Sequence, residues 1–187
     1  MSAQPQALAA VPLADRLDRA LIKLGEWVAW IFFLLMLVIL TQVILRRGFS
    51  AGLVALEELQ WHLYAIGVFI GAVYAQANNS HVRVDIFHAG FGPKAKSIIE
   101  ILGLLFLLMP FLLLLFWHSL DFVYESWRID ERSLAPAGLP LRWLIKSLIP
   151  ATMVLLMLAA LNRLLRDAIV LKRLFSGTSS NTTEGGR

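Results

Sequence analysis

Residues 27–45 read WVAWIFFLLMLVILTQVIL, a run of 19 in which only Thr41 and Gln42 are polar. A helix needs about 20 apolar residues, each rising about 1.5 Å, to cross the roughly 30 Å hydrocarbon core of a bilayer. The run is too long for the core of a typical signal peptide, and Arg46 and Arg47 follow it in place of a small-residue cleavage site. It therefore predicts a retained transmembrane helix.

Three further apolar stretches have the same character, at residues 59–77, 98–120 and 144–161. The chain of 187 residues is 58% hydrophobic and 16% charged, whereas soluble domains carry about 25% charged residues. We therefore expect an all-α integral membrane protein with four transmembrane helices. Its membrane domain is expected to cover residues 13–175, between disordered tails at residues 1–12 and 176–187.

Lysine and arginine predict which way the spans face. With four spans, both tails and the middle loop share one side, and this side carries 11 Lys and Arg residues against 6 on the other side. We therefore expect both termini in the cytoplasm. The net charge of +4 follows from this bias, and no folded basic and aromatic patch indicates a nucleic-acid partner.

Two leucine repeats flank the first span. They are Leu13, Leu17, Leu21 and Leu24 before it, and Leu53, Leu56 and Leu59 after it. The helical spacing predicts amphipathic segments that lie in the membrane interface, although the first repeat can also prolong the span itself.

The ionisable residues near the spans lie at their ends. They are Glu26, Glu57, Glu58, Glu100 and Lys146. A self-contained transporter needs ionisable groups inside its spans to bind a coupling ion, so this distribution disfavours an independent small transporter or channel. We expect these groups to act as interfacial anchors or ion pairs, and Glu58 to pair with Arg46 or Arg47 across the first hairpin.

Few residues suggest chemistry of their own. The chain has no cysteine, which excludes disulfides, thiol nucleophiles and thiolate metal sites. His62 and His118 are both expected near the outer ends of spans, so a haem-bearing membrane anchor of a redox complex stays the alternative function. His81 and His88 lack carboxylate partners at metal-binding spacing. We expect no catalytic, cofactor-binding or metal-binding residue in this chain.

Residues 67–71 read GVFIG, and small residues four apart let two membrane helices approach closely. The pattern predicts tight packing through Gly67 and Gly71, either inside the bundle or against another protein. In the third span, Pro110 removes one backbone hydrogen bond and is expected to kink the helix.

Several short motifs follow one another along the spans. They are Gln42-Val43-Ile44-Leu45-Arg46, Glu57-Glu58-Leu59, Gly71-Ala72, His81-Val82-Arg83-Val84-Asp85 and Gly138-Leu139-Pro140, followed by Trp143 and Pro150. In this order and spacing the chain resembles, from about Leu24 to Leu165, the DctQ-type small membrane subunit of tripartite ATP-independent periplasmic (TRAP) transporters.

The resemblance implies a function in a bacterial inner membrane. Such subunits pair with a larger, many-span permease that carries the substrate and sodium sites, and a periplasmic binding protein delivers the substrate, usually an organic acid. The small subunit has no known catalysis and braces the large one, with membrane lipids as its other neighbours. The positions that match motifs are Arg46, Glu57, Glu58, His81, Arg83 and Asp85, for which the resemblance implies structural and interface roles.

Overall fold

The computed structural model describes residues 12–78, 92–135 and 137–176, and every regular element in them is helical. The elements are α1 (Pro12–Gly48), α2 (Val54–Ala77), α4 (Pro93–Leu102), the π-helical segment η1 (Gly103–Leu108), α5 (Met109–Arg128) and α6 (Arg142–Ser176). The all-α class predicted from the sequence is confirmed for these residues.

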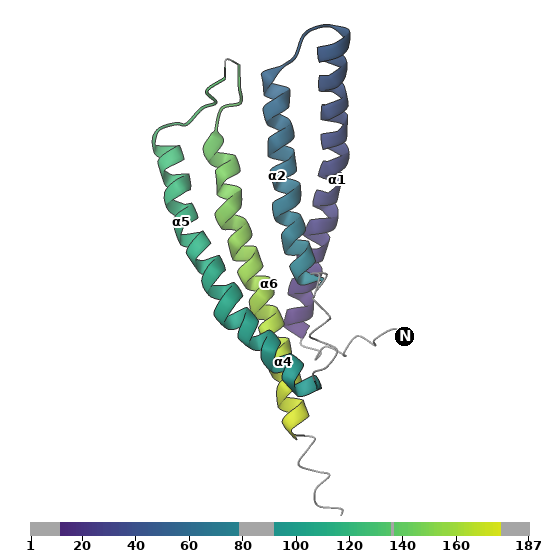
Figure 1. Cartoon of the computed structure of the whole chain (residues 1–187), viewed down its shortest axis with the longest axis vertical. Helices are drawn as coiled ribbons and strands as arrows, with labels where there is room; N and C mark the ends of the chain where they lie inside the picture. Colours follow the sequence, from purple (N-terminus) through teal and green to yellow (C-terminus); the bar gives the residue numbers. More distant parts are fainter. Residues whose placement is uncertain (1–11, 79–91, 136, 177–187) are drawn as a thin grey trace, which may run out of the picture.

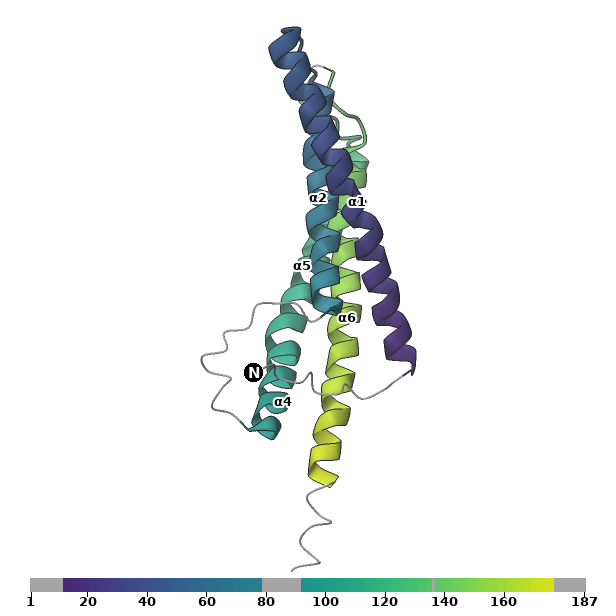
Figure 2. The same ribbon diagram turned by 90° about the vertical axis from the view of Figure 1, so that its right-hand side faces the viewer.

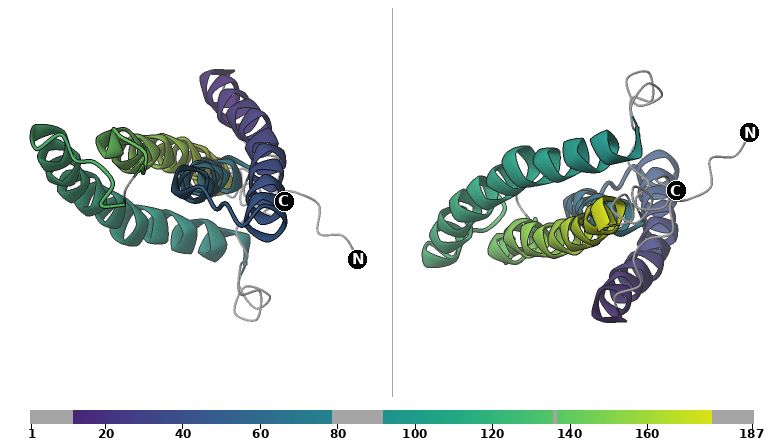
Figure 3. Two further views of the ribbon diagram at one scale, coloured as in Figure 1. Left: turned by 90° about the horizontal axis from the view of Figure 1, so that it is seen from above. Right: turned by 90° about the horizontal axis from the view of Figure 1, so that it is seen from below.

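The long helices form a row, in the order α5, α6, α2 and α1 (Figure 1). α1 packs against α2, α5 packs against α6, and α2 packs against α6 between the two pairs. Seen edge-on, the row is narrow where α1 turns into α2, whereas α4, α6 and the start of α1 diverge toward the opposite end (Figure 2). α1 and α5 lie on opposite sides of the α2–α6 pair when seen along the helices (Figure 3). We name the end with the α1–α2 turn and the α5–α6 loop the hairpin end, and the end where α1 begins and α6 ends the terminal end.

Three helical stretches are long and apolar enough to cross a membrane. They are Ala14–Gly48, Ser97–Arg128 and Arg142–Lys172. α2 is not among them, because polar side chains such as Gln60 and His62, both half-buried, lower its hydropathy. Its 24 residues still correspond to about 36 Å of helix, which is enough to cross the hydrocarbon core. The fourth span therefore stays a prediction.

The two leucine repeats belong to the long helices. Leu21 lies in a buried core with Val73 of α2 and Ala159 of α6, and Leu17 packs against this core. The first repeat therefore prolongs α1, which is one of the two arrangements expected. The second repeat belongs to the start of α2, which begins at Val54, and its place in the membrane interface stays a prediction.

The irregularity expected at Pro110 takes the form of a π-helical segment. Proline has no N–H, so the carbonyl of Phe106, four residues earlier, loses its α-helical donor. The turn immediately before widens, and the N–H of Met109 bonds to the carbonyl of Leu104, five residues back. α4, η1 and α5 thus follow one another as one continuous helical rod.

Candidate functional site

At the hairpin end, one carboxylate joins the two helix pairs. Glu58, in the first turns of α2, accepts hydrogen bonds from the hydroxyl of Ser133 and from the backbone N–H of Leu139, the latter at 2.6 Å. A guanidinium nitrogen of Arg142, at the start of α6, lies 3.4 Å from the same carboxylate. Because Ser133 and Leu139 belong to the α5–α6 loop, Glu58 fastens α2 to that loop.

A second carboxylate lies beside Glu58 in the same loop. Glu131 forms an ion pair with Lys146, and a guanidinium nitrogen of Arg142 lies 4.0 Å from it. The Lys146 ammonium also lies 4.0 Å from the centroid of the Phe122 ring, a cation–π arrangement. An unpaired lysine in the first turns of an apolar helix is costly in a membrane, and these partners explain how α6 carries one. We name this set the hairpin cluster: Glu58, Glu131, Ser133, Arg142 and Lys146.

The donors and cations of the hairpin cluster act on both carboxyl groups. The hydrogen bond from Lys146 holds the pKa of Glu131, which lies in the loop, below its ordinary value of 4.5. The Ser133 hydroxyl, followed by the Leu139 N–H and Arg142, lowers the pKa of Glu58, which precedes the predicted span 59–77. Both carboxyl groups are therefore ionised at neutral pH, the form in which they accept these hydrogen bonds.

Acid is expected to loosen the hairpin end. A carboxyl group whose pKa is lowered in the folded state contributes stability above its ordinary value of 4.5, and this stability is lost as the pH falls through the lowered value. Thermal unfolding of the purified chain, followed from pH 7 to pH 3, should therefore show a drop in midpoint below about pH 4.5. In Glu131→Gln this drop should be smaller, whereas Glu125→Gln, which removes an exposed carboxylate paired with Arg128 on α5, should keep it. Equal acid profiles in the wild type and Glu131→Gln would contradict the assignment.

Arg46 pairs with Glu57 and not with Glu58. A guanidinium nitrogen of Arg46 lies 3.4 Å from the Glu57 carboxylate. Gln42 donates to that carboxylate at 3.3 Å, and its own amide oxygen accepts the N–H of Leu53 at 3.4 Å. The predicted pairing of Glu58 with Arg46 or Arg47 is therefore wrong. Consecutive helical residues point about 100° apart, so Glu57 faces the α1 side while Glu58 faces the α5–α6 loop.

At the terminal end, a buried arginine of α6 joins two partly exposed aspartates of α1. The guanidinium of Arg166, only 6% exposed, lies 2.6 Å from Asp15 and 2.8 Å from Asp18. Asn162, one turn earlier on α6, donates to the carbonyl of Ala14 at 3.0 Å and to the carboxylate of Asp18 at 2.6 Å. The start of α1 is thus held against α6 by four polar contacts.

The same group of charges reaches α4. Arg163 lies 3.0 Å from Glu100 of α4 and 3.0 Å from Asp167, one turn further along α6. Three helices therefore meet through side chains that we name the terminal cluster: Asp15, Asp18, Glu100, Asn162, Arg163, Arg166 and Asp167. Arg163, Arg166 and Asp167 are largely buried, so removal of a partner leaves a poorly solvated charge on α6.

Arg163 and Arg166 are two of the 11 Lys and Arg residues from which the cytoplasmic side was predicted. Their acidic partners were not predicted. The available signal was spacing: Asp15 and Asp18 are three residues apart, and Asn162 and Arg166 are four apart, so each pair shares one helix face. Spacing shows which side chains share a face. It does not show which two faces meet.

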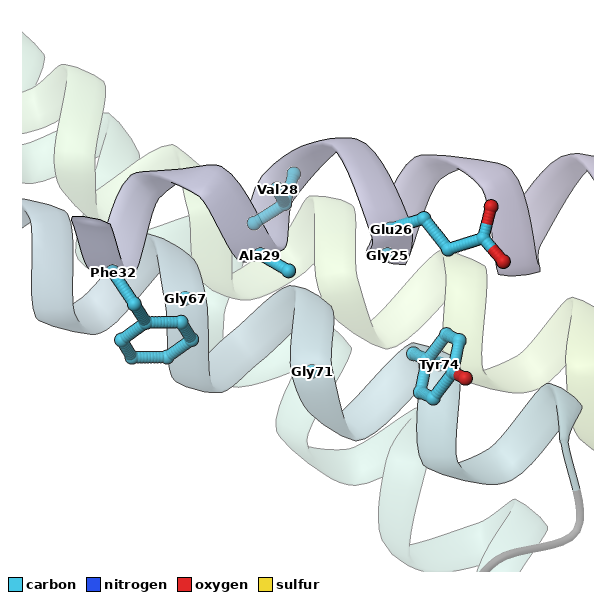
Figure 4. A pocket seen from close by; sticks show the side chains of 8 residues that line it. All are labelled: Gly25, Glu26, Val28, Ala29, Phe32, Gly67, Gly71 and Tyr74. Atoms are coloured by element: carbon cyan, nitrogen blue, oxygen red, sulfur yellow. The ribbon is translucent and has the colours of Figure 1, made fainter. Parts of the chain in front are cut away.

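The two glycines of the GVFIG motif have different surroundings (Figure 4). A Cβ at Gly67 would lie 2.5 Å from Cζ of Phe32 on α1, whereas nothing lies within 4 Å of a Cβ at Gly71. Gly67 therefore serves packing inside this chain, and Gly71 borders a shallow groove of about 280 Å³. Gly25 of α1, which the sequence reasoning missed, is also closely packed, since a Cβ there would lie 2.6 Å from Cβ of Tyr74.

The remaining candidate residues do not form a reactive site in the described part of the chain. α6 lies between the helices that carry His62 and His118 (Figure 3), and His118 is exposed. Nδ1 of His62 donates to the carbonyl of Glu58 at 2.6 Å. Among the described residues, no three His, Asp or Glu side chains are grouped so that they could hold a metal ion. His81, Arg83 and Asp85 lie outside the described residues.

The chain is similar to known proteins over most of its length. Residues 35–169 match the family of tripartite ATP-independent periplasmic transporters, DctQ component. A protein of Haemophilus influenzae, assigned as a TRAP transporter small permease protein, is 27% identical over 111 residues, which are 59% of this chain and 66% of that protein. The family match includes the whole hairpin cluster and the α4 and α6 members of the terminal cluster, and it begins after Asp15 and Asp18.

Proposed function

Because this chain belongs to the family of DctQ components of tripartite ATP-independent periplasmic transporters, we propose that it is a small permease subunit that braces a larger membrane permease. Its family and the assigned role of the Haemophilus influenzae relative support the proposal. The bracing role, the partner and the transported solute go beyond these similarities and are argued from the structure and tested below.

The bracing role rests on one observation: charged side chains join the helices of the row to one another, whereas apolar side chains cover its outer surface. The charged groups of the hairpin and terminal clusters tie helices of this chain to one another. The outer surface is apolar, with Trp27 of α1 77% exposed and Leu107 of η1 78% exposed. A row of helices has two broad faces, so one can cover a partner while the other faces lipid.

The transport chemistry is assigned to the partner. Residues 27–45 and 101–117, which are described throughout, contain no acidic or basic side chain that could bind a coupling ion at mid-membrane. We infer that the large permease binds an organic acid and a cation, sodium in this proposal, after a periplasmic protein has delivered the acid. This chain supplies a fixed support in a bacterial inner membrane.

Reconstitution tests the proposed function directly. Proteoliposomes that contain this chain, a co-expressed large permease and the binding protein should accumulate the organic acid when a sodium gradient is applied. Vesicles with the chain alone should not accumulate it, and omission of the chain should abolish uptake by the other two. Solute uptake by the pure chain, with no larger membrane protein present, would overturn the proposal.

We also propose that α2 is the fourth span and that both termini are cytoplasmic. The chain has no cysteine, so single cysteines report topology without background. In spheroplasts, a membrane-impermeant maleimide should label Ala51→Cys and Leu134→Cys at the hairpin end. It should label Asn78→Cys and Lys172→Cys only after the membrane is opened. Equal labelling of Ala51→Cys and Asn78→Cys would show that α2 does not cross, and the reverse pattern at all four positions would invert the orientation.

A further inference from the structure

An apolar groove lies between α1 and α6 at the terminal end. It has a volume of about 480 Å³, and its lining includes Leu17 of α1 and three leucines of α6, Leu158, Leu161 and Leu165. The α6 leucines are 40%, 45% and 50% exposed, so the groove is open along its length. From Leu158 to Leu165 it follows about two turns, or roughly 10 Å, of helix.

A cation lies at the edge of this groove. Arg16 is exposed and borders the groove, and none of the described residues forms an ion pair with it. The nearby acidic groups are already engaged, since Asp15 and Asp18 both contact Arg166. The other arginine of this turn, Arg19, donates to the carbonyl of Asp15 at 3.1 Å. Arg16 is thus an exposed cation that is available to bind an anion at the edge of the groove.

We propose that this groove binds an acyl chain of an anionic phospholipid whose phosphate pairs with Arg16. Leu165 is next to Arg166 and therefore level with the start of α1, while Leu158 lies deeper along α6. The order along the groove, from a cation at the end of the molecule to leucines toward its middle, matches the order of a phospholipid from headgroup to chain. Guanidinium groups bind phosphate through two parallel hydrogen bonds.

The charge at the groove favours a lipid over a protein helix. Arginine beside a membrane surface contributes about 1 kcal/mol of attraction to anionic lipid, which corresponds to about a five-fold change in binding. A transmembrane helix in the same groove would gain this attraction only if it placed an acidic residue at headgroup depth. The lipid site does not depend on the proposed function. Only its assignment to the cytoplasmic leaflet depends on the proposed orientation.

Native mass spectrometry of the full-length chain tests the site. The chain is released from a mild detergent supplemented with equal amounts of phosphatidylglycerol and phosphatidylcholine that carry the same acyl chains. The wild type should retain one phosphatidylglycerol in preference to phosphatidylcholine. Arg16→Gln should reduce this preference about five-fold, while Arg19→Gln, three residues further along α1, should leave it unchanged. Leu161→Trp, which fills the groove, should reduce retention of both lipids.

Four results would overturn the proposal. The first is equal retention of the two lipids by the wild type. The second is an equal loss of preference in Arg16→Gln and Arg19→Gln, which would indicate a general surface charge effect. The third is displacement of phosphatidylglycerol by inorganic phosphate alone, which would mean that the groove contributes nothing. The fourth is a Leu161→Trp protein that retains phosphatidylglycerol but no longer co-purifies with the large permease, which would show that a protein helix and not a lipid occupies the groove.

Discussion

Replacing Arg166 with methionine is expected to lower the free energy of unfolding of the purified chain by about 1–3 kcal/mol, because the carboxylates left behind, Asp15 and Asp18, keep 40% and 21% of their side chains exposed to solvent. The Arg166 side chain lies 2.6 Å from Asp15 and 2.8 Å from Asp18 and is almost fully buried. Methionine keeps an unbranched apolar stem of similar reach but leaves two carboxylates without their cation. Denaturant titration in detergent micelles, followed by tryptophan fluorescence, measures the change.

Two further variants show whether the loss is electrostatic. Lys172→Met removes an exposed cation from the same helix and should change stability by less than about 0.5 kcal/mol. Adding Asp18→Asn to Arg166→Met removes one of the uncompensated charges, so the double variant should be more stable than the sum of the two single changes predicts. Equal losses in Arg166→Met and Lys172→Met would show that the terminal cluster does not hold α1 against α6.

Replacing Gly25 with alanine is expected to cost about 1–3 kcal/mol, as overpacking of a well-packed contact usually does. The new Cβ would lie 2.6 Å from Cβ of Tyr74. A Cβ is attached directly to the backbone, so rotation of the Tyr74 ring cannot relieve this contact and α1 must move away from α2. At Gly67 the obstructing atom is the far end of the Phe32 ring, which can rotate, so Gly67→Ala should cost less.

Gly71→Ala is the matched control for this prediction. It adds the same methyl group on the neighbouring helix, beside the groove shown in Figure 4, and nothing lies within 4 Å of its Cβ. Because alanine is a better helix former than glycine by about 1 kcal/mol, Gly71→Ala should unfold at the same temperature as the wild type or higher. A Gly25→Ala protein as stable as Gly71→Ala would show that α1 and α2 are not in close contact at Gly25.

The helices themselves were predictable from the chain, because long apolar runs with charged ends have few alternatives. The first, third and fourth predicted spans lie within helices that are long and apolar enough to cross a membrane. The family was predictable as well, from motifs such as Glu57-Glu58-Leu59, and the family match confirms it. α2 was harder, since its polar side chains are half-buried between two other helices and its composition therefore differs from that of a lipid-exposed span.

The contacts between helices were not predictable in the same way. Nothing in the order of residues distinguishes Glu57, which meets Arg46, from Glu58, which meets Ser133 some 75 positions later. Likewise, an arginine near the end of a span predicts the orientation of that span in the membrane, whatever its surroundings. It can lie in water or, like Arg166, contact two aspartates of another helix. Side-chain partners depend on how helices are placed around one another, and a single sequence contains that information only indirectly.

The position of the two clusters at opposite ends of the row has a mechanical consequence. A pair of helices that is fastened to its neighbour at one point can rotate about that point. Here Glu58 fastens the α1–α2 pair to the α5–α6 loop, and Arg166 fastens α1 to α6 at the far end. Two separated fastenings prevent this rotation within the plane of the row, and a slide of one helical turn, about 5.4 Å, would break both at once. The α1–α2 and α5–α6 hairpins are therefore held in one register along their length, as the proposed bracing role requires.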